Sequence, residues 1–371
     1  MKTVFKKILD SVFRAASSIM PDPFSVEASF GCKATKGEYM LPINYDLLPL
    51  HVQEELRIGY DINEVKIYKL RNVFISPEGI IFKNIKIFLP SLASTLIKDL
   101  LGHAFLVRQF TPFLKPFIEF EDSVIVAHDQ WSQNYYHWMI DLLPKLLLLD
   151  DKLKQNILIL PQYGADYMTL TLSALGYKSF YKVKDNSVLK AKTVFLPDRT
   201  AIGNLQNPEL LGVLRELLVK AFCPGNVRAT RRIYVSRARS QKRRLINEHE
   251  IINILKKYEF EHLYFEELTF LQQIEVMQQA QVLIGVHGAN LVNILFMQQG
   301  TNVIELMNSD FTNLVYYRMA STLKLPYYLV PCSPDPSNKD KSDGTIFTKN
   351  DVDIEINPSD LKNILQKIFL Y

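Results

Sequence analysis

Short apolar runs alternate with longer helical patterns along most of the chain beyond residue 120. Runs at 123–127, 157–160, 193–196 and 282–285 have the length and the β-branched composition of buried strands. Most are followed by a segment in which apolar positions recur with helical spacing. This alternation predicts βαβ units, and therefore an α/β protein with parallel sheets.

Two changes in this pattern predict how the chain is divided. Polar–apolar alternation over 62–90, with a Pro-Glu-Gly turn, indicates a hairpin or meander and hence a β-rich N-terminal extension. The sequence Cys-Pro-Gly-Asn at 223–226 interrupts the α/β pattern. We therefore expect an N-terminal domain over 1–222, a C-terminal domain over 227–355, and a last helix over 358–371.

Residues 1–20 have the pattern of a basic amphipathic helix. Apolar pairs recur every four residues, separated mainly by lysine and arginine. Such a helix can lie in a membrane interface beside anionic lipid, or it can dock on its own domain. Charges interrupt the apolar residues, so a signal peptide is not expected, and no run has the length of a transmembrane helix.

Composition narrows the functional classes. Hydrophobic residues make up 48% and charged residues 22%, as in soluble globular proteins, and the formal net charge of +4 is too small to indicate a nucleic-acid binder. The three cysteines are far apart without a C-x-x-C motif, which argues against a disulfide framework or a zinc site. We therefore expect a cytoplasmic protein, with peripheral contact to the inner face of the plasma membrane if residues 1–20 bind lipid.

The clearest motif of the C-terminal half is a strand, a turn and a helix over 282–297. The strand ends at Gly285, and the turn His287-Gly288-Ala289-Asn290 leads directly into the helix. Small residues allow close approach to the backbone, and a helix N-terminus offers unpaired N–H groups to an anion. Glu305 ends the next strand, where a carboxylate could bind a ribose diol. A nucleotide site is one interpretation; a structural His287 and a capping Glu305 are the other.

A run of arginines and lysines without an acid extends over 228–244. Arg237 directly follows a predicted strand, where α/β sheets bind their ligands. Arg243 and Arg244 precede a helix that Asn247 could cap. Guanidinium groups can neutralise a diphosphate without a metal. A solvated face or an RNA-binding patch is the alternative.

The helix predicted over 134–150 carries a polar stripe on an otherwise apolar surface. Asn134, His137 and Asp141 share one helical face, next to Trp138. His137 and Asp141, spaced i and i+4, can hydrogen-bond, and the carboxylate would orient the imidazole as a general base. A satisfied buried network is the alternative.

Taken in order, these motifs resemble glycosyltransferase family 61, especially its bacterial capsular-polysaccharide members. The resemblance rests on Asn134-x-x-His137-x-x-x-Asp141, on Ser236-Arg237 with Arg243-Arg244 and Asn247, and on His287-Gly-Ala with Gly300-Thr-x-Val-Ile-Glu305. It covers about residues 120 to 330. Asn290 and Gln133 stand at positions where the family often has glycine.

The resemblance implies a GT-B-like fold of two Rossmann-like domains facing across a cleft, with the last helix crossing back to the N-terminal domain. It also implies an inverting transfer from a nucleotide-sugar, with a UDP-sugar as the expected co-substrate and no further cofactor. The acceptor would be a glycan of a capsular or lipopolysaccharide pathway, including lipid-linked forms. The catalytic residues would be His137 and Asp141, with Asn134 and Trp138 on the acceptor side. The donor-binding residues would be Arg237, Arg243, Arg244, His287, Gly288, Ala289, Asn290 and Glu305.

We also expect the transfer to be independent of metal, because no Asp-x-Asp lies near these motifs and Asp351-Val-Asp353 falls late, in a loop. Two alternatives remain: another nucleotide-dependent transferase or hydrolase, and a basic nucleic-acid-binding α/β protein that uses 228–244. The sequence leaves open the donor nucleotide and sugar, the acceptor and linkage, the oligomeric state, and which of His137 and Asp141 is the base.

Overall fold

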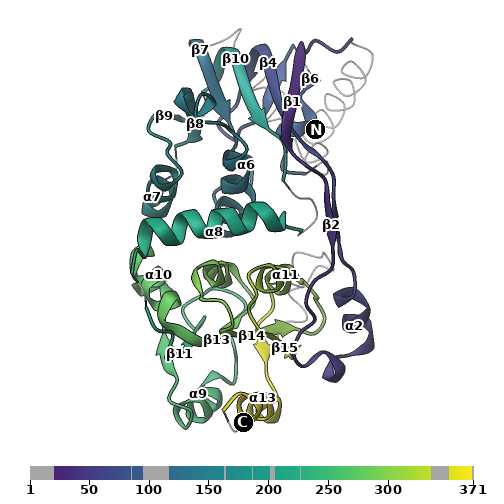
Figure 1. Cartoon of the computed structure of the whole chain (residues 1–371), viewed down its shortest axis with the longest axis vertical. Helices are drawn as coiled ribbons and strands as arrows, with labels where there is room; N and C mark the ends of the chain where they lie inside the picture. The colour runs from purple at the N-terminus through teal and green to yellow at the C-terminus, as the bar shows by residue number, and fades with distance from the viewer. Residues whose placement is uncertain are drawn as a thin grey trace, which may run out of the picture. The chain divides into compact units, whose positions relative to one another are not determined.

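The chain forms two compact units (Figure 1), each with its own sheet. The computed structural model describes residues 21–84, 86–94, 117–162, 164–185, 187–200, 205–225, 227–335 and 351–369. Within these ranges, unit 1 comprises residues up to Ala34 together with Ile62–Thr200, and unit 2 comprises Thr35–Asp61 together with the chain after residue 200. The helix predicted over 1–20 lies outside the described residues.

Unit 1 is built on an eight-stranded mixed sheet in the order β6-β5-β4-β10-β7-β8-β9, with β1 paired to β4. The strands are β1 (Val26–Cys32), β4 (Val65–Ile75), β5 (Ile81–Lys83), β6 (Lys86–Ile87), β7 (Ile118–Val126), β8 (Ile157–Pro161), β9 (Phe180–Val183) and β10 (Leu189–Pro197). The four strands β9-β8-β7-β10 are parallel. Counted along the chain, their order is 3-2-1-4, as in one half of a Rossmann fold.

The predicted meander is present as β4, β5 and β6, which pair antiparallel. The turn between β4 and β5 requires Gly79, which has a φ of +80°. A Cβ atom at this position would lie 2.2 Å from the backbone oxygen of His128, so there is also no room for a side chain here. This contact joins the meander to the segment that follows β7.

The helix predicted over 134–150 is interrupted by a wider turn. A π-helix, η3 (His137–Leu142), leads into the short α6 (Leu143–Leu147), and the N–H of Leu143 reaches the carbonyl of Trp138. Pro144 explains this turn, because its ring lacks an N–H and would clash with the carbonyl one α-turn earlier. π-Turns of this kind are frequent at functional sites. The next helix, α7 (Asp166–Ala174), ends two residues before Gly176, which has a φ of +88°.

Unit 2 contains a six-stranded sheet in the order β12-β11-β13-β14-β15-β16. The strands are β11 (Arg231–Val235), β12 (Glu261–Leu263), β13 (Ala280–Val286), β14 (Asn302–Asn308), β15 (Tyr327–Pro334) and β16 (Ile354–Glu355). The first five are parallel, and their order along the chain is 2-1-3-4-5, the flavodoxin-like doubly wound order.

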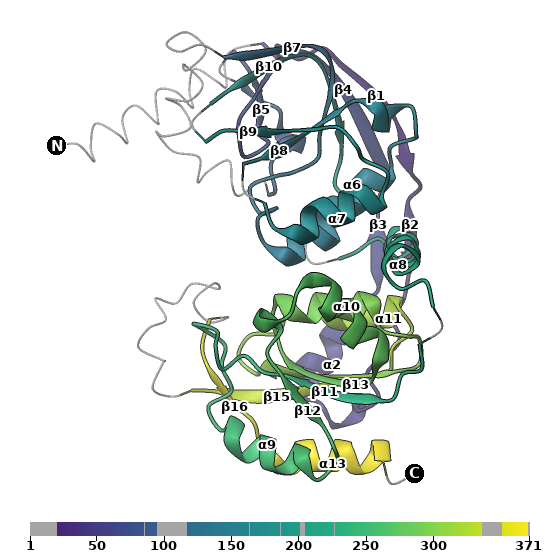
Figure 2. The ribbon, with the colours of Figure 1, turned by 90° about the vertical axis from the view of Figure 1, so that its left-hand side faces the viewer.

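Helices cover both faces of this sheet (Figure 2). One face carries α9 (Glu248–Lys256) and α13 (Pro358–Phe369), and the other carries α10 (Phe270–Gln279) and α11 (Val315–Thr322). The helix predicted in the motif over 282–297 is a 3₁₀ helix, η6 (Ala289–Phe296), which contacts α10 and α11. Helix α10 begins with a capping box, in which Thr269 and Gln272 bond reciprocally.

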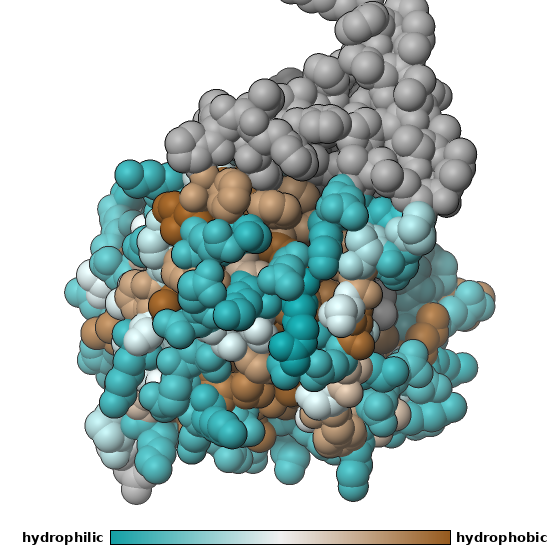
Figure 3. All heavy atoms as spheres, turned by 90° about the horizontal axis from the view of Figure 1, so that it is seen from above, coloured by the Kyte–Doolittle hydropathy of each residue, from teal (hydrophilic) through white to brown (hydrophobic). Residues whose placement is uncertain are grey.

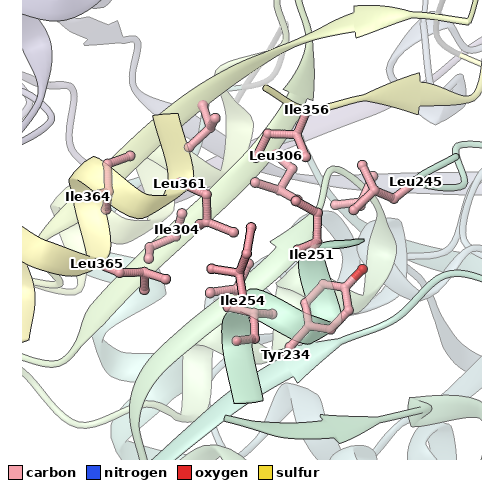
Figure 4. Close-up of a cluster of buried hydrophobic side chains, with 14 of the residues drawn as sticks. Tyr234, Leu245, Ile251, Ile254, Ile304, Leu306, Ile356, Leu361, Ile364 and Leu365 are labelled. Atoms are coloured by element: carbon pink, nitrogen blue, oxygen red, sulfur yellow. The ribbon is translucent and has the colours of Figure 1, made fainter. Parts of the chain in front are cut away.

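Alternate residues of the central strands separate the two layers. Ile304 and Leu306 of β14 belong to the apolar cluster that α9 and α13 close from their side (Figure 4). Glu305 points to the opposite face because side chains alternate along a strand, and it is fully buried there. A charged group thus occupies a core position between two aliphatic residues.

The division into units differs from the predicted domain boundaries. Residues 35–61 belong to unit 2, because the Asn44 side chain bonds both the N–H and the C=O of Leu329 while the N–H of Ile43 donates to Tyr327. This segment satisfies the outer edge of β15, so a piece of the predicted N-terminal domain completes the second sheet.

The helices at the predicted boundaries also belong to unit 2. Helix α8 (Pro208–Phe222) was expected in the N-terminal domain, but Arg215 donates to the carbonyl of Met297 at 2.7 Å. Helix α13 was expected to cross back to the N-terminal domain. Its buried residues Leu361 and Leu365 instead pack in the core of unit 2 beside α9. The buried residues of α9 belong to the same apolar cluster, so the apolar stripe of α13 completes the core on this face of the sheet.

The protein is thus a mixed α/β protein with two sheets rich in parallel strands, which confirms the pattern read from the sequence. On the face drawn in Figure 3, hydrophobic residues form small groups among hydrophilic ones. Ion pairs such as Lys190–Glu119 and Lys192–Glu121 link the neighbouring strands β10 and β7. None of the helices in the described ranges is long and apolar enough to cross a membrane.

Candidate functional site

Unit 2 has its topological switch point between β11 and β13, where the strand order reverses. Val235 pairs with Gly285, so Arg237 leaves the sheet beside His287. In open α/β sheets, ligands bind at this edge, outside the carboxyl ends of the strands. The fold therefore brings together the two motifs that the sequence singled out in this half of the chain.

Arg237 and Gly288 contact each other directly. A Cβ atom on Gly288 would lie 2.4 Å from Nη1 of Arg237 and 3.0 Å from its Cζ. The backbone of Gly288 is extended, with a φ of 163°, so the glycine is needed for space and not for its conformation. The guanidinium is held there by the Ser240 hydroxyl at 2.9 Å and the Lys242 carbonyl at 3.3 Å. Gly288 thus allows an arginine to lie across the start of η6.

Arg237 and Arg243 lack a carboxylate partner within the described part of the chain. Their Nε atoms are both buried without an acceptor, and only 8% of Arg237 is exposed. Burial, together with the nearby charge of Arg243, lowers the pKa of Arg237 to about 10. The Nδ2 atom of Asn290 is also buried without a partner. A buried cation without a carboxylate partner is costly, so the buried Arg237 beside the partly buried Arg243 at a switch point indicates an anion-binding site.

Five other basic residues of the run over 228–244 are neutralised by ion pairs. These pairs are Arg231–Glu261, Arg232–Glu259, Arg239–Glu267, Lys242–Asp351 and Arg244–Asp353. Among the described basic residues of this run, Arg237 and Arg243 are therefore set apart from these five paired ones; the absence of a nucleic-acid partner stays a prediction.

Arg244 is not part of the anion site. Both its Nε and Nη2 atoms donate to Asp353 Oδ2, at 3.0 and 2.7 Å, and its backbone N–H donates to Asp353 Oδ1. Asp351 and Asp353, which bind Lys242 and Arg244, therefore anchor this part of the basic run. Asn247 begins α9, but its side chain bonds the backbone of Ile356 and does not cap the helix.

Glu305 lies in the middle of β14, three residues before its last residue Asn308, and not at the strand end as expected. Its Oε1 is 2.5 Å from Nδ1 of His287, and its Oε2 accepts a hydrogen bond from the Tyr327 hydroxyl. The carboxylate is fully buried, so it is not placed to bind a ribose diol. In this structure it holds His287.

Two hollows lie beside the turn that contains His287. One is lined by Arg243, His287 and Phe311 among others. The other is lined by Arg237 and Asn290 together with apolar residues, most of them from β11 and β13. Each hollow is therefore bordered by one of the two unpaired arginines.

Unit 1 also gathers polar residues at its own switch point, between β7 and β10. Asp129 follows β7 and Arg199 follows β10, and sequence reasoning missed both. Burial lowers the pKa of Arg199, while the carboxylates of Asp129, Asp141 and Asp198 act in the opposite direction. The His137–Asp141 pair therefore belongs to this cluster. The position of Arg199 directly after a strand, the same signal that identified Arg237, could have revealed it.

The predicted hydrogen bond between His137 and Asp141 is present. Nδ1 of His137 lies 2.6 Å from Oδ2 of Asp141, and the two side chains are 28% and 35% exposed. The ring of Trp131 lies 5.1 Å from the imidazole. Because the carboxylate engages Nδ1, Nε2 is the nitrogen that can exchange a proton with a ligand.

Two residues expected on the acceptor side have structural contacts instead. Asn134 is exposed, and its Oδ1 accepts from the N–H of Tyr136 in the turn that opens the helix. Trp138 is only 1% exposed and donates from Nε1 to Thr171 Oγ1 at 3.0 Å. The wide turn of η3 directs Trp138 into the core, so the polar stripe is reduced to His137 and Asp141.

A buried ion pair forms part of this cluster. Lys145 of α6 lies 3.3 Å from Asp129, and both side chains are less than 10% exposed. Burial alone would raise the pKa of Asp129, but Lys145 and hydrogen bonds from Trp131 and Ser132 lower it below its ordinary value. Lys145 gave no sequence signal, because it stands in an apolar helix.

Within the described residues, no group of three or more His, Cys, Asp or Glu side chains could hold a metal ion. Metal independence stays a prediction.

Comparison with known proteins supports the resemblance. Residues 135–304 match the family model described as glycosyltransferase 61. The matched region contains His137, Asp141, Arg237, Arg243 and His287, and Glu305 follows directly after it.

Curated relatives match a shorter stretch. The chain is 34% identical over 83 residues to an EGF domain-specific O-linked N-acetylglucosamine transferase from Drosophila melanogaster. The enzymes of the same name from Canis lupus familiaris and Rattus norvegicus are 29% and 31% identical over 84 residues. The aligned stretch covers 21 to 22% of this chain and 16% of each relative. The similarity is therefore distant and covers only a small part of each chain.

Proposed function

We propose that the protein is an inverting glycosyltransferase that transfers a sugar from a nucleotide-sugar to a hydroxyl group of a glycan. The observation that carries this proposal is the pair of unpaired arginines, Arg237 and Arg243, at the β11–β13 switch point. The family 61 match over 135–304 supports it independently of that geometry.

In the proposed reaction, unit 2 binds the donor. Breaking the bond between the sugar and the nucleotide leaves negative charge on the diphosphate, and preorganised donors stabilise that charge. Arg237, Arg243 and the N–H groups at the start of η6 can supply them. No step of this stabilisation requires a metal.

Unit 1 supplies the base in the same proposal. An inverting transfer needs one group that removes the proton of the acceptor hydroxyl as the oxygen attacks the anomeric carbon. Nε2 of His137 suits this role, because Asp141 holds Nδ1 and the ring is partly exposed. In the GT-B-like fold that we propose, each Rossmann-like unit contributes one of these two sets of groups.

For the substrates, the relatives suggest where to begin. They are named as transferases of N-acetylglucosamine, so we propose a UDP-sugar of this kind as the first donor to test. A capsular or lipopolysaccharide glycan as acceptor, and a location at the inner face of the membrane through residues 1–20, are proposals that rest on the sequence resemblance and on the basic pattern of those residues.

The first experiment is thermal unfolding with UDP, GDP, CMP and ADP, each with and without EDTA. A ligand at one hundred times its dissociation constant stabilises the folded state by about 2.7 kcal/mol. We expect one nucleotide to raise the midpoint equally with and without EDTA. If no nucleotide raises the midpoint, the donor site is refuted. If a nucleotide does bind, but the sugar of the nucleotide-sugar is released to water and to no acceptor, the enzyme is a hydrolase.

A further inference from the structure

The buried groups behind the turn at His287 have a role that the proposed donor site alone does not give them. We propose that Glu305 and Tyr327 are positioning residues that fix the imidazole of His287, so that His287 and not Glu305 contacts the diphosphate of the donor. This inference rests on the proposed function, because it concerns how the same site holds its anion.

Both oxygens of Glu305 are occupied inside the protein. Oε1 is 2.5 Å from His287 Nδ1, and Oε2 accepts from the Tyr327 hydroxyl. The side chain of Glu305 has no exposed surface, and Tyr327 is only 3% exposed. A ligand could reach this carboxylate only by opening the core, whereas His287 stands at the edge of the sheet, directly after β13.

The arrangement of protons follows from the same contacts. Burial, together with the charge of Glu305, raises the pKa of Tyr327 well above its ordinary value, so this phenol keeps its proton and donates it. With Oε2 taken, Oε1 accepts the Nδ1–H of His287. Nε2 is then the ring nitrogen left for a ligand, as in metal sites where a second carboxylate fixes the histidine that binds.

The site shares one electrostatic environment with the unpaired arginines. The ring centroid of Tyr316 lies 5.1 Å from that of His287. Burial and the charge of Glu305 raise the pKa of this phenol above its ordinary value, while Arg243 and Arg237 act in the opposite direction. Nη1 of Arg243 also approaches the carbonyl of His287, at 3.5 Å. Glu305 therefore adds a fixed negative charge behind two cations and leaves them open toward the hollow bordered by Arg243 and His287.

The test combines nuclear magnetic resonance with anion binding. In protein labelled with ¹⁵N-histidine, the His287 signals are assigned by their loss in His287→Gln. We expect the proton on Nδ1 in the wild-type neutral ring, and a mixture of tautomers in Glu305→Gln, where the anionic acceptor is gone. A neutral His287 that carries its proton on Nε2 in the wild type would overturn the inference, whatever the protein binds.

Inorganic pyrophosphate is the second probe, titrated by calorimetry. Because a hydrogen bond with a charged partner is stronger than a neutral one, we expect Glu305→Gln to weaken its affinity about tenfold, and Tyr327→Phe about two- to threefold. Tyr327→Phe retains the carboxylate and is the informative variant if Glu305→Gln does not fold. Unchanged affinity in both variants, with unchanged tautomers, would also overturn the inference.

Tyr234→Phe is the matched control. It likewise removes a buried hydrogen bond from tyrosine to glutamate, here to Glu248 at 2.7 Å, but on the face of the sheet that packs against α9. We expect reduced stability with unchanged His287 signals and unchanged pyrophosphate affinity. If the wild-type protein binds neither pyrophosphate nor a nucleotide, the proposed donor site fails, while the tautomer measurement still judges the positioning of His287 by itself.

Discussion

Two histidine–carboxylate pairs have the same short contact and opposite surroundings. In unit 1, His137 and Asp141 are 2.6 Å apart, and both side chains keep about a third of their surface exposed. In unit 2, His287 and Glu305 are 2.5 Å apart, and they are 8% and 0% exposed. Under the proposed function, the first pair is exposed enough to exchange protons with an acceptor, whereas the second is built into the core and serves donor binding.

The charges around each pair differ in the same sense. In unit 1, Arg199 interacts with Asp141 of the pair and with two further carboxylates, those of Asp129 and Asp198, an environment that suits binding a neutral hydroxyl and removing its proton. Two unpaired arginines flank the pair in unit 2, which suits binding an anion. A histidine held by a carboxylate thus does not identify a base by itself; burial and neighbouring charge decide its role.

The largest expected effect separates the two histidines. We expect His137→Ala to lower the rate of transfer by about 10² to 10⁴, the contribution of a general base, while nucleotide affinity is retained. His287→Ala should instead lower nucleotide affinity. Steady-state rates and nucleotide titrations on both variants check this. Equal loss of nucleotide affinity in both would remove the distinction between the pairs.

The next effect concerns the unpaired arginines. Arg237→Met should weaken nucleotide binding about tenfold or more, yet raise the unfolding midpoint without ligand, because it removes a buried charge that has no carboxylate partner in the described residues. Arg244→Ala is the comparison: it breaks an ion pair with Asp353 and should leave nucleotide affinity within about twofold. A destabilised Arg237→Met protein would show that the guanidinium has a structural role.

A smaller effect is expected from one methyl group. Gly288→Ala should displace the Arg237 guanidinium, because the new Cβ would lie 2.4 Å from Nη1, and nucleotide affinity should fall several-fold. Gly212→Ala, in α8, adds the same methyl group where nothing lies within 4 Å. It should leave binding unchanged and stabilise the protein by about 0.5–1 kcal/mol. Calorimetry and thermal unfolding measure both.

The smallest effect tests the correction at Trp138. Trp138→Phe removes the hydrogen bond to Thr171 from a buried site, and we expect a loss of about 1–3 kcal/mol in the free energy of unfolding. The KM for an acceptor should not change, because the indole lies in the core. An increase in that KM with little loss of stability would return Trp138 to the acceptor side.

Much of the local structure could be predicted from the sequence. The strands β7, β8, β11, β13 and β14 and the capping box of α10 follow from apolar runs and from residues that are neighbours in the chain. The same holds for the placement of Arg237 and His287 after parallel strands, since the ends of such strands share one edge. The hydrogen bond between His137 and Asp141 follows from their spacing on one helix.

Only the tertiary structure decided the contacts between distant parts of the chain. Asn44 bonds Leu329 and draws residues 35–61 into unit 2, and Asp353 removes Arg244 from the site. The space that Gly288 leaves for Arg237 is of the same kind. The pattern of a segment reports which faces are apolar, because that depends on neighbouring residues; it does not report which distant group meets a given side chain, because the packing of whole elements determines that. For this reason the sequence identified Glu305 as important, and the fold determined that it holds His287 from inside the core.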